Sequence, residues 1–249
     1  TRRSVDIFTK RIDSIIHENK HPGFNNYYNK NAKTDIALTY NDIAVLESYH
    51  VSEAFKIMQD KKNNIFENIS DEEYRVARRR IIESILSTDM ANHGKHLTQL
   101  KAKLESLNIV EGQNLEKIVS DNVNKNYESQ QMILNMMVHS ADVSNPGKSK
   151  NVYVKWVDLI FNEFFNQGDI EKSKGLSVSL LCDRESTNIN KSQIGFINFI
   201  VKPTFECMIN IIPNLSVYMD NIVVNCKYYE DLVKAEEEKK SKSIKKFKQ

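Results

Sequence analysis

Apolar residues recur at intervals of three and four positions along most of the chain, which is the spacing of one face of an α-helix. This spacing predicts a helix through Val45, Leu46, Tyr49, Ala54, Phe55 and Met58, with Asp42 or Asn41 as its amino-terminal cap. A second long helix is predicted after Ser70, because Ser70 and Glu73 have the spacing of a capping box.

The pattern continues through the middle of the chain. A helix is predicted over residues 96–107, with its leucines on one face. The segment 128–138 carries an apolar stripe that we expect to be buried, formed by Met132, Ile133, Met136 and Met137. Strand-like alternation does not stand out, so an all-α fold is expected.

The last third of the chain is divided by turn residues. One helix is expected to end near Gly168, and residues 175–191 are expected to form a loop. Ser192 is a candidate cap for a very apolar helix, which Pro203 should kink or interrupt. Residues 233–249 are expected to form a charged tail, either helical or disordered.

Composition narrows the function classes. Lys and Arg total 35 and Asp and Glu total 33, so the net charge of +2 does not favour a nucleic-acid partner. The three cysteines form no CxxC pair and are expected to be free thiols in a reducing compartment. We expect no membrane span, because no apolar run approaches the ~20 residues that a transmembrane helix needs.

Candidate chemistry lies in two short segments, residues 17–26 and 139–146. A borderline divalent cation accepts imidazole nitrogen as well as carboxylate oxygen. His17, Glu18 and Asp142 therefore form a candidate ligand set. The residue types alone leave this open, because a His-Glu pair is usually surface decoration and a histidine near a buried helix end is often structural.

The ordered motifs change this balance. The chain contains H-x-x-x-H-P-G-x-x-N at 17–26, H-x-A-D-x-S-N-P at 139–146 and S-Q-x-G-F-I-x-F-I-V-x-P-x-x-E at 192–206. In this order, they resemble the class I 3′,5′-cyclic-nucleotide phosphodiesterases over residues 17 to about 212. The resemblance implies a compact multi-helix phosphodiesterase-type domain, here residues 1–232, with a two-metal pocket.

The resemblance assigns metal-site roles to five residues. His17 and Asp142 match zinc ligands of the family, and Glu18 stands where the family has an aspartate that contacts both metals. His21 and Glu47 match a pair behind the metals that is expected to orient the reacting water. The implied cofactors are two divalent ions, zinc and magnesium, with manganese as an alternative to magnesium.

The resemblance also implies a nucleotide pocket. Gln193 matches the glutamine that binds the purine, and Phe196 matches the aromatic residue that stacks on its face, with Ile160 as the opposite wall. Asn145 and Tyr153 fall at other pocket-lining positions. The preference between cAMP and cGMP stays open, because the amide of Gln193 can face either way.

The implied reaction is hydrolysis of a 3′,5′-cyclic nucleotide (cAMP, cGMP or both) to the 5′-nucleoside monophosphate by a water that two metals activate. The implied partner is therefore a small-molecule nucleotide. A cytoplasmic location is expected, with any membrane association residing in parts outside this chain. Homodimerisation is left open.

The chain departs from the family pattern at its amino end. It lacks the upstream Y-H-N-x-x-H-A-x-D element that carries the proton-donating histidine and another zinc ligand, which suggests an amino-terminal truncation or divergence. Glu18 is one methylene longer than the aspartate of the family, and Lys20 replaces an acidic position. We therefore expect this polypeptide to hydrolyse cyclic nucleotides poorly or not at all.

Two other interpretations remain at this point. The first is a catalytically inactive homologue that binds nucleotides or partner proteins through Gln193 and Phe196. The second is an unrelated helical scaffold, which would require the ordered motifs to be accidental.

Overall fold

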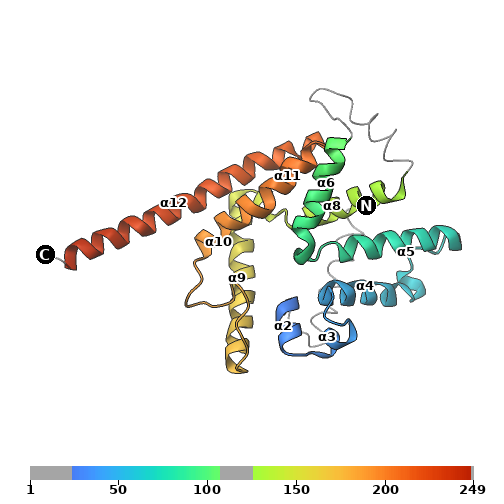
Figure 1. Ribbon diagram of the computed structural model, residues 1–249, viewed down its shortest axis with the longest axis horizontal. Helices are drawn as coiled ribbons and strands as arrows, with labels where there is room; N and C mark the ends of the chain where they lie inside the picture. The colour runs from blue at the N-terminus through green and yellow to red at the C-terminus, as the bar shows by residue number, and fades with distance from the viewer. Residues whose placement is uncertain (1–23, 107–125, 248–249) are drawn as a thin grey trace. The chain divides into compact units, whose positions relative to one another are not determined.

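The structure, a computed structural model, describes residues 24–106 and 126–247, and of these the side chains of residues 243–247 are not described. Every regular element in these ranges is helical, which confirms the all-α fold (Figure 1). The α-helices are α2 (Asn26–Asn31), α3 (Asp35–Thr39), α4 (Val45–Met58), α5 (Asp71–Leu86), α6 (His93–Ser106), α8 (Tyr127–Asp142), α9 (Lys150–Ser173), α10 (Ile189–Phe196), α11 (Lys202–Ile209) and α12 (Ser216–Phe247).

Short helical turns connect several of these helices. They are η1 (Lys61–Asn63), η2 (Met90–Asn92), η3 (Asn145–Gly147), the π-helical η4 (Ile197–Val201) and η5 (Pro213–Leu215). In the part of the chain that the structure describes, no helix has both the length and the apolar character needed to cross a membrane.

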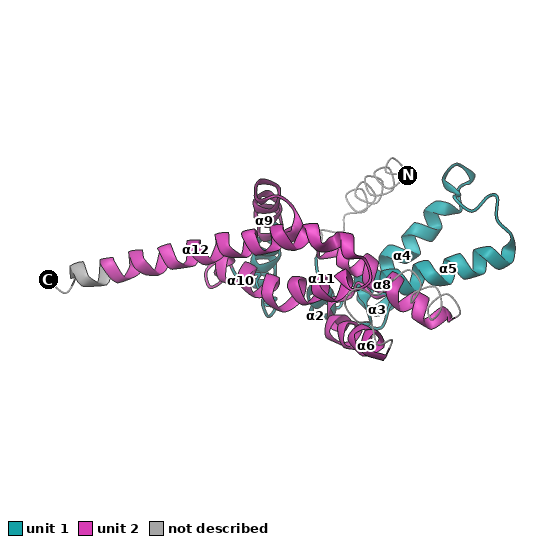
Figure 2. Cartoon of the chain, turned by 90° about the horizontal axis from the view of Figure 1, so that it is seen from above, with its two compact units in different colours: residues 1–86, 163–183 teal, residues 87–162, 184–249 magenta. Residues whose placement is uncertain are grey.

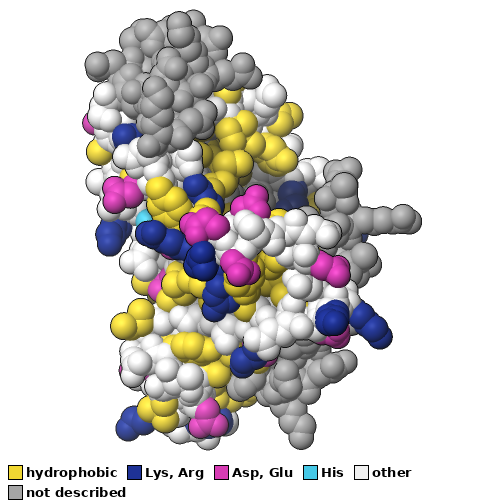
Figure 3. Space-filling view, turned by 90° about the vertical axis from the view of Figure 1, so that its right-hand side faces the viewer, with side chains coloured by type: hydrophobic (Ala, Val, Ile, Leu, Met, Phe, Trp, Pro, Cys, Tyr) yellow, Lys and Arg dark blue, Asp and Glu magenta, His cyan; other side chains and the backbone are white. Residues whose placement is uncertain are grey.

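The chain divides into two compact units (Figure 2). Unit 1 comprises residues 1–86 and 163–183, and unit 2 comprises residues 87–162 and 184–249. Helix α9 contributes its first half to unit 2 and its second half to unit 1. On the face in Figure 3, Lys and Arg side chains lie beside Asp and Glu side chains, in keeping with the small net charge.

One apolar cluster in the core of unit 1 is formed where α4 packs against α5. Its buried members are Val51, Ala54, Phe55 and Met58, with Phe66, Ile81, Ile82 and Ile85 packed against them. The guanidinium of Arg78 lies 4.1 Å from the centre of the Phe55 ring, so a cation covers the edge of this core. The predicted capping box is confirmed, because the Ser70 N–H donates to the Glu73 carboxylate and the Glu73 N–H donates to Ser70 Oγ.

The predicted cap of α4 is wrong. The helix begins at Val45 after Ala44, whose side chain makes no capping hydrogen bond. Asn41 and Asp42 instead have φ values of 53° and 62°, in the left-handed region that Asn and Asp tolerate better than most residues. They reverse the chain between α3 and α4, a turn that helical periodicity does not reveal.

One apolar cluster in the core of unit 2 lies among α6, α8 and α11. Leu97, Leu100, Met136, Cys207 and Met208 are its buried members. The expected burial of the α8 stripe is only partly correct, because Met136 is 1% exposed whereas Met137 is 42% exposed. All three cysteines are free, as expected from the sequence, and all three are buried.

Two other predicted boundaries are corrected. Helix α9 continues through Gly168 to Ser173, because Gly168 lies inside the helix at a close contact with the carbonyl oxygen of Cys182. Helix α10 is capped by Asn188, whose side chain accepts from the Lys191 N–H, and Ser192 lies within the helix.

The interruption predicted at Pro203 is confirmed. The π-helical η4 ends at Val201, and Pro203 stands in the first turn of α11. Proline lacks the N–H that a continuing helix would use, so the hydrogen-bond register changes just before it. Such π-helical insertions are frequent at functional sites.

Candidate functional site

Three of the predicted metal-site residues, His17, Glu18 and His21, lie outside the described residues. The two others are described, Glu47 in unit 1 and Asp142 in unit 2. In α4, Glu47 Oε2 accepts a hydrogen bond from the Asn26 amide at 2.9 Å. Asn26 Oδ1 also accepts from the Leu46 N–H at 2.8 Å. Asn26 closes the H-x-x-x-H-P-G-x-x-N motif, so Glu47 holds the end of that motif.

Asp142 is the last residue of α8. Its side chain reaches solvent, yet the protein atoms around the carboxyl remove enough water to raise the pKa of Asp142 above its usual range. Within residues 24–106 and 126–247 it makes no ion pair, and no three His, Cys, Asp or Glu side chains gather as a metal site. A partly desolvated carboxylate suits a cation, but the described residues supply only one member of the predicted ligand set.

Sequence reasoning missed a buried pair of histidines beside Asp142. Nδ1 of His93 and Nε2 of His139 lie 2.8 Å apart, and one of these atoms must donate to the other. His139 is fully buried, and burial lowers its pKa to about 4, with His93 and His96 adding to the effect. The outer nitrogens, His93 Nε2 and His139 Nδ1, are buried without a hydrogen-bond partner in the described part of the chain.

This pair predicts a pH dependence of stability. A histidine in the unfolded chain titrates near pH ~6.5, whereas His139 in the fold titrates near pH 4. Between these values the unfolded chain binds more protons, so the free energy of unfolding should fall as the pH is lowered from ~6.5 towards 4. Urea unfolding at several pH values measures this slope, and His139→Leu should flatten it. An equal slope in the variant would show that His139 takes up its proton in the fold as it does in the unfolded chain.

The turn after Asp142 is fixed from α12. The Asn225 amide donates to the carbonyl oxygens of Pro146 and Lys148 at 2.7 and 2.8 Å. The Asn221 amide donates to the Gly147 carbonyl at 2.9 Å. Asn145, a predicted pocket residue, opens this turn and accepts a hydrogen bond from Lys148 Nζ. Helix α12 therefore determines where the end of the H-x-A-D-x-S-N-P motif lies.

The predicted purine-binding glutamine meets a predicted pocket tyrosine. Gln193 is 7% exposed in α10, and its Oε1 accepts a hydrogen bond from the hydroxyl of Tyr153 in α9. Tyr153 is 1% exposed, and burial raises its pKa, so the hydroxyl remains a donor at neutral pH. Among the described residues Gln193 Nε2 has no partner. The amide therefore keeps a donor and a second acceptor lone pair for a ligand.

The predicted walls of the pocket are accessible. Ile160 is 38% exposed and Trp156, one turn earlier in α9, is 47% exposed. Phe196 is half-buried at the end of α10. Exposed aromatic and apolar side chains in unit 2 offer surface on which a flat ring can stack.

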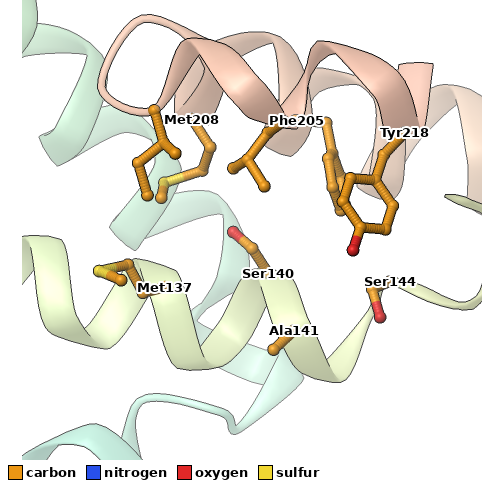
Figure 4. Close-up of a pocket in the computed structure, with 9 residues that line it drawn as sticks. Met137, Ser140, Ala141, Ser144, Phe205, Met208 and Tyr218 are labelled. Atoms are coloured by element: carbon orange, nitrogen blue, oxygen red, sulfur yellow. The ribbon is translucent and has the colours of Figure 1, made fainter.

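A cavity of about 210 Å³ lies between α8, α11 and the start of α12 (Figure 4). Its lining is largely apolar and includes Met137, Ala141, Phe205, Met208 and Tyr218. None of the predicted pocket residues lines it. Met137 and Ala141 of the lining lie one turn apart on one face of α8, whereas Asp142 lies on the face of residues 135 and 138. This cavity is therefore distinct from the predicted nucleotide pocket.

Comparisons with known proteins agree with the motifs. Residues 2–222 match the family described as 3′,5′-cyclic nucleotide phosphodiesterase. Isoform F of the Drosophila melanogaster 3′,5′-cyclic-AMP phosphodiesterase is 36% identical over 223 residues, which are 88% of this chain and 32% of the relative. The chain thus spans about a third of the length of this curated relative.

Solved structures show the same fold. The phosphodiesterase domain of the RhoPDE fusion protein from the choanoflagellate Salpingoeca rosetta has a TM-score of 0.76 and 30% identity, covering 88% of this chain and 66% of that chain. LmjPDEB1 in complex with IBMX has a TM-score of 0.75 and 26% identity, covering 86% of this chain and 62% of that chain. The chain belongs to the 3′,5′-cyclic nucleotide phosphodiesterase family.

Proposed function

We propose that the protein hydrolyses 3′,5′-cyclic nucleotides to 5′-nucleoside monophosphates. The family match over residues 2–222 supports this reaction, and the bond between Tyr153 and Gln193 is the observation that carries the substrate class. A buried glutamine whose amide is held at one end presents a donor and an acceptor side by side, which is what the hydrogen-bonding edge of a purine requires.

The described residues take distinct roles in this proposal. Gln193 binds the edge of the base, and Phe196 and Ile160 pack against its two faces. Tyr153 holds the amide of Gln193 through its hydroxyl. Asn145, at the turn that α12 fixes, lies three residues beyond Asp142 and lines the phosphate side of the pocket.

Members of this family depend on metal ions. We propose zinc and magnesium, with manganese as an alternative to magnesium, for this chain. When bound, the ions would polarise the phosphoryl oxygens and acidify a water. His17, Glu18 and Asp142 would hold them, whereas Glu47 and His21 would orient the reacting water. The raised pKa of Asp142 fits such a role, since a neighbouring cation would favour its ionised form.

An inactive nucleotide-binding homologue is the second candidate. Glu18 favours it, because its side chain is one methylene longer than the aspartate that the family has at this position. The same pocket would then bind a cyclic nucleotide without cleaving it. We also propose a cytoplasmic location and a homodimeric state for this chain.

Turnover and binding, measured together, separate the two functions. The chain is incubated with cAMP or cGMP and Mg²⁺, Mn²⁺ or Zn²⁺, and nucleotide binding is titrated in parallel without metal. The proposed enzyme gives metal-dependent turnover, slowed by Glu18. Saturable binding without turnover under any ion favours the inactive homologue, and the absence of both contradicts each proposal.

A further inference from the structure

Unit 1 contains a buried carboxylate that has no role in the predicted site. Glu171, in the second half of α9, is fully buried. Its Oε2 accepts the Ser179 N–H at 2.7 Å, and its Oε1 accepts both the Ser179 hydroxyl and the Gln167 amide. A buried carboxylate without a cation partner persists only where several donors satisfy it, so its surroundings are specifically arranged for a negative charge.

Gln167 extends this arrangement towards the amino-terminal motif. It is 2% exposed, and its Oε1 accepts the N–H of Asn25 at 2.9 Å. Its Nε2 donates to Glu171 Oε1 at 2.9 Å and to Ser179 Oγ at 2.8 Å. The two ends of the amide therefore have different partners, and only one orientation satisfies both.

The hydrogen-bonded series of Ser179, Glu171, Gln167 and Asn25 is called the relay below. At one end of this relay lies the exit of the H-x-x-x-H-P-G-x-x-N motif. Asn25 follows Gly23 by two residues, and its side chain caps α2 by accepting the Tyr28 N–H at 2.9 Å. The Asn29 amide donates to the carbonyl oxygens of Phe24 and Asn25, which adds two hydrogen bonds to this capped turn.

At the other end lies the segment after α9, which folds back against the helix. Leu176 N–H donates to the Glu171 carbonyl at 2.9 Å, and Lys172 pairs with Asp183 at 2.7 Å. Leu181 has a φ of 67°, which is unusual for a branched side chain and shows that the surroundings hold the segment in place.

We infer that Glu171 is a positioning residue, which acts through Gln167 on the backbone of Asn25, where the H-x-x-x-H-P-G-x-x-N motif ends. It holds both the exit of this motif and the segment that carries Leu181 in fixed positions against α9. This inference rests on the proposed function for its catalytic consequence, whereas the relay itself is a property of the described residues.

The direction of each hydrogen bond makes the relay testable. In Glu171→Gln, the new amide oxygen can accept the Ser179 N–H only if the new NH₂ faces the NH₂ of Gln167. Turning Gln167 over would remove that conflict but would aim its NH₂ at the Asn25 N–H. Either way, two donors oppose each other in a buried site, which is the costly arrangement.

Exchanging the side chains at positions 167 and 171 should again match every hydrogen-bond donor with an acceptor. In the double variant Glu171→Gln with Gln167→Glu, the carboxylate at 167 accepts from Asn25 and from the new amide at 171. The oxygen of that amide accepts the Ser179 N–H. Charge and composition equal those of the wild type, so the double variant tests the order of donors and acceptors rather than packing.

Amide hydrogen exchange reports the relay directly, with or without enzymatic activity. In Glu171→Gln, exchange at Asn25, which does not touch Glu171, should rise about tenfold or more, and the double variant should return it towards the wild-type rate. Glu163→Gln, the same change at an exposed position of α9, is the control and should leave Asn25 unchanged. Unchanged exchange in Glu171→Gln, or no rescue in the double variant, overturns the inference.

Kinetics then test the consequence. In an active chain, Glu171→Gln should lower kcat about tenfold or more. The KM for cyclic nucleotide should change little, because Gln193 lies in unit 2. The double variant should restore kcat. A rise in KM with kcat unchanged would contradict the inference that Glu171 acts on the catalytic motif. Absence of turnover in the wild type would instead count against the proposed function, and the exchange data would still decide the relay.

Discussion

Gly168→Ala is expected to destabilise unit 1 by about 3 kcal/mol or more, the upper range for overpacking. A Cβ at this position would lie 1.9 Å from the carbonyl oxygen of Cys182 and 2.7 Å from its carbonyl carbon. Both atoms belong to the backbone, so no side-chain rotation relieves the clash. The segment that Glu171 and Lys172 hold against α9 would have to move away from the helix.

Gly94→Ala is the matched control for this change. Gly94 also lies inside a helix, and a Cβ there meets nothing within 4 Å, so alanine should be neutral or stabilise by up to ~1 kcal/mol. Urea unfolding of both variants measures the difference in free energy of unfolding. Equal stability of the two variants would contradict the close approach of Cys182 to α9.

Gln193→Ala is expected to weaken cyclic-nucleotide binding about tenfold to a hundredfold. The variant removes the donor and the acceptor that we assign to the purine edge, and it leaves the buried hydroxyl of Tyr153 without its partner. Both losses act on the same pocket, whereas Asp142 and its turn are unaffected. Titration calorimetry with cAMP and cGMP measures the change.

Gln131→Ala provides the control for Gln193→Ala. Gln131 is likewise a buried glutamine of unit 2, and its amide donates to Asn135 Oδ1 within α8. The control should reduce stability to a similar degree while leaving nucleotide affinity unchanged. A similar loss of affinity in both variants would remove the role of Gln193 in binding the base.

The sequence predicts helices well where periodicity alone decides them. The capping box at Ser70 and the break at Pro203 follow from local chemistry, and the structure contains both. Local chemistry is insufficient where a distant contact determines the outcome. A glycine often ends a helix, but α9 continues through Gly168. The carbonyl group of Cys182 occupies the space that the missing Cβ leaves.

The candidate site also has features that the sequence predicts and features that depend on distant contacts. The motifs identify Gln193 and Tyr153 as pocket residues, but the hydrogen bond between them depends on how α9 meets α10. The buried pair of His93 and His139 joins positions 46 residues apart, and no spacing rule predicts it. The roles assigned to His17, Glu18 and His21 stay predictions, because these residues lie outside the described ranges.

The most direct test of the central claim follows the oxygen that water contributes. The chain is incubated with cAMP in H₂¹⁸O and a divalent metal, and the product is analysed by mass spectrometry. Hydrolysis at phosphorus predicts 5′-AMP with one ¹⁸O in its phosphate, formed slowly by the wild type and not by Asp142→Ala. Absence of labelled 5′-AMP, or its formation at the same rate in Asp142→Ala, would contradict the account.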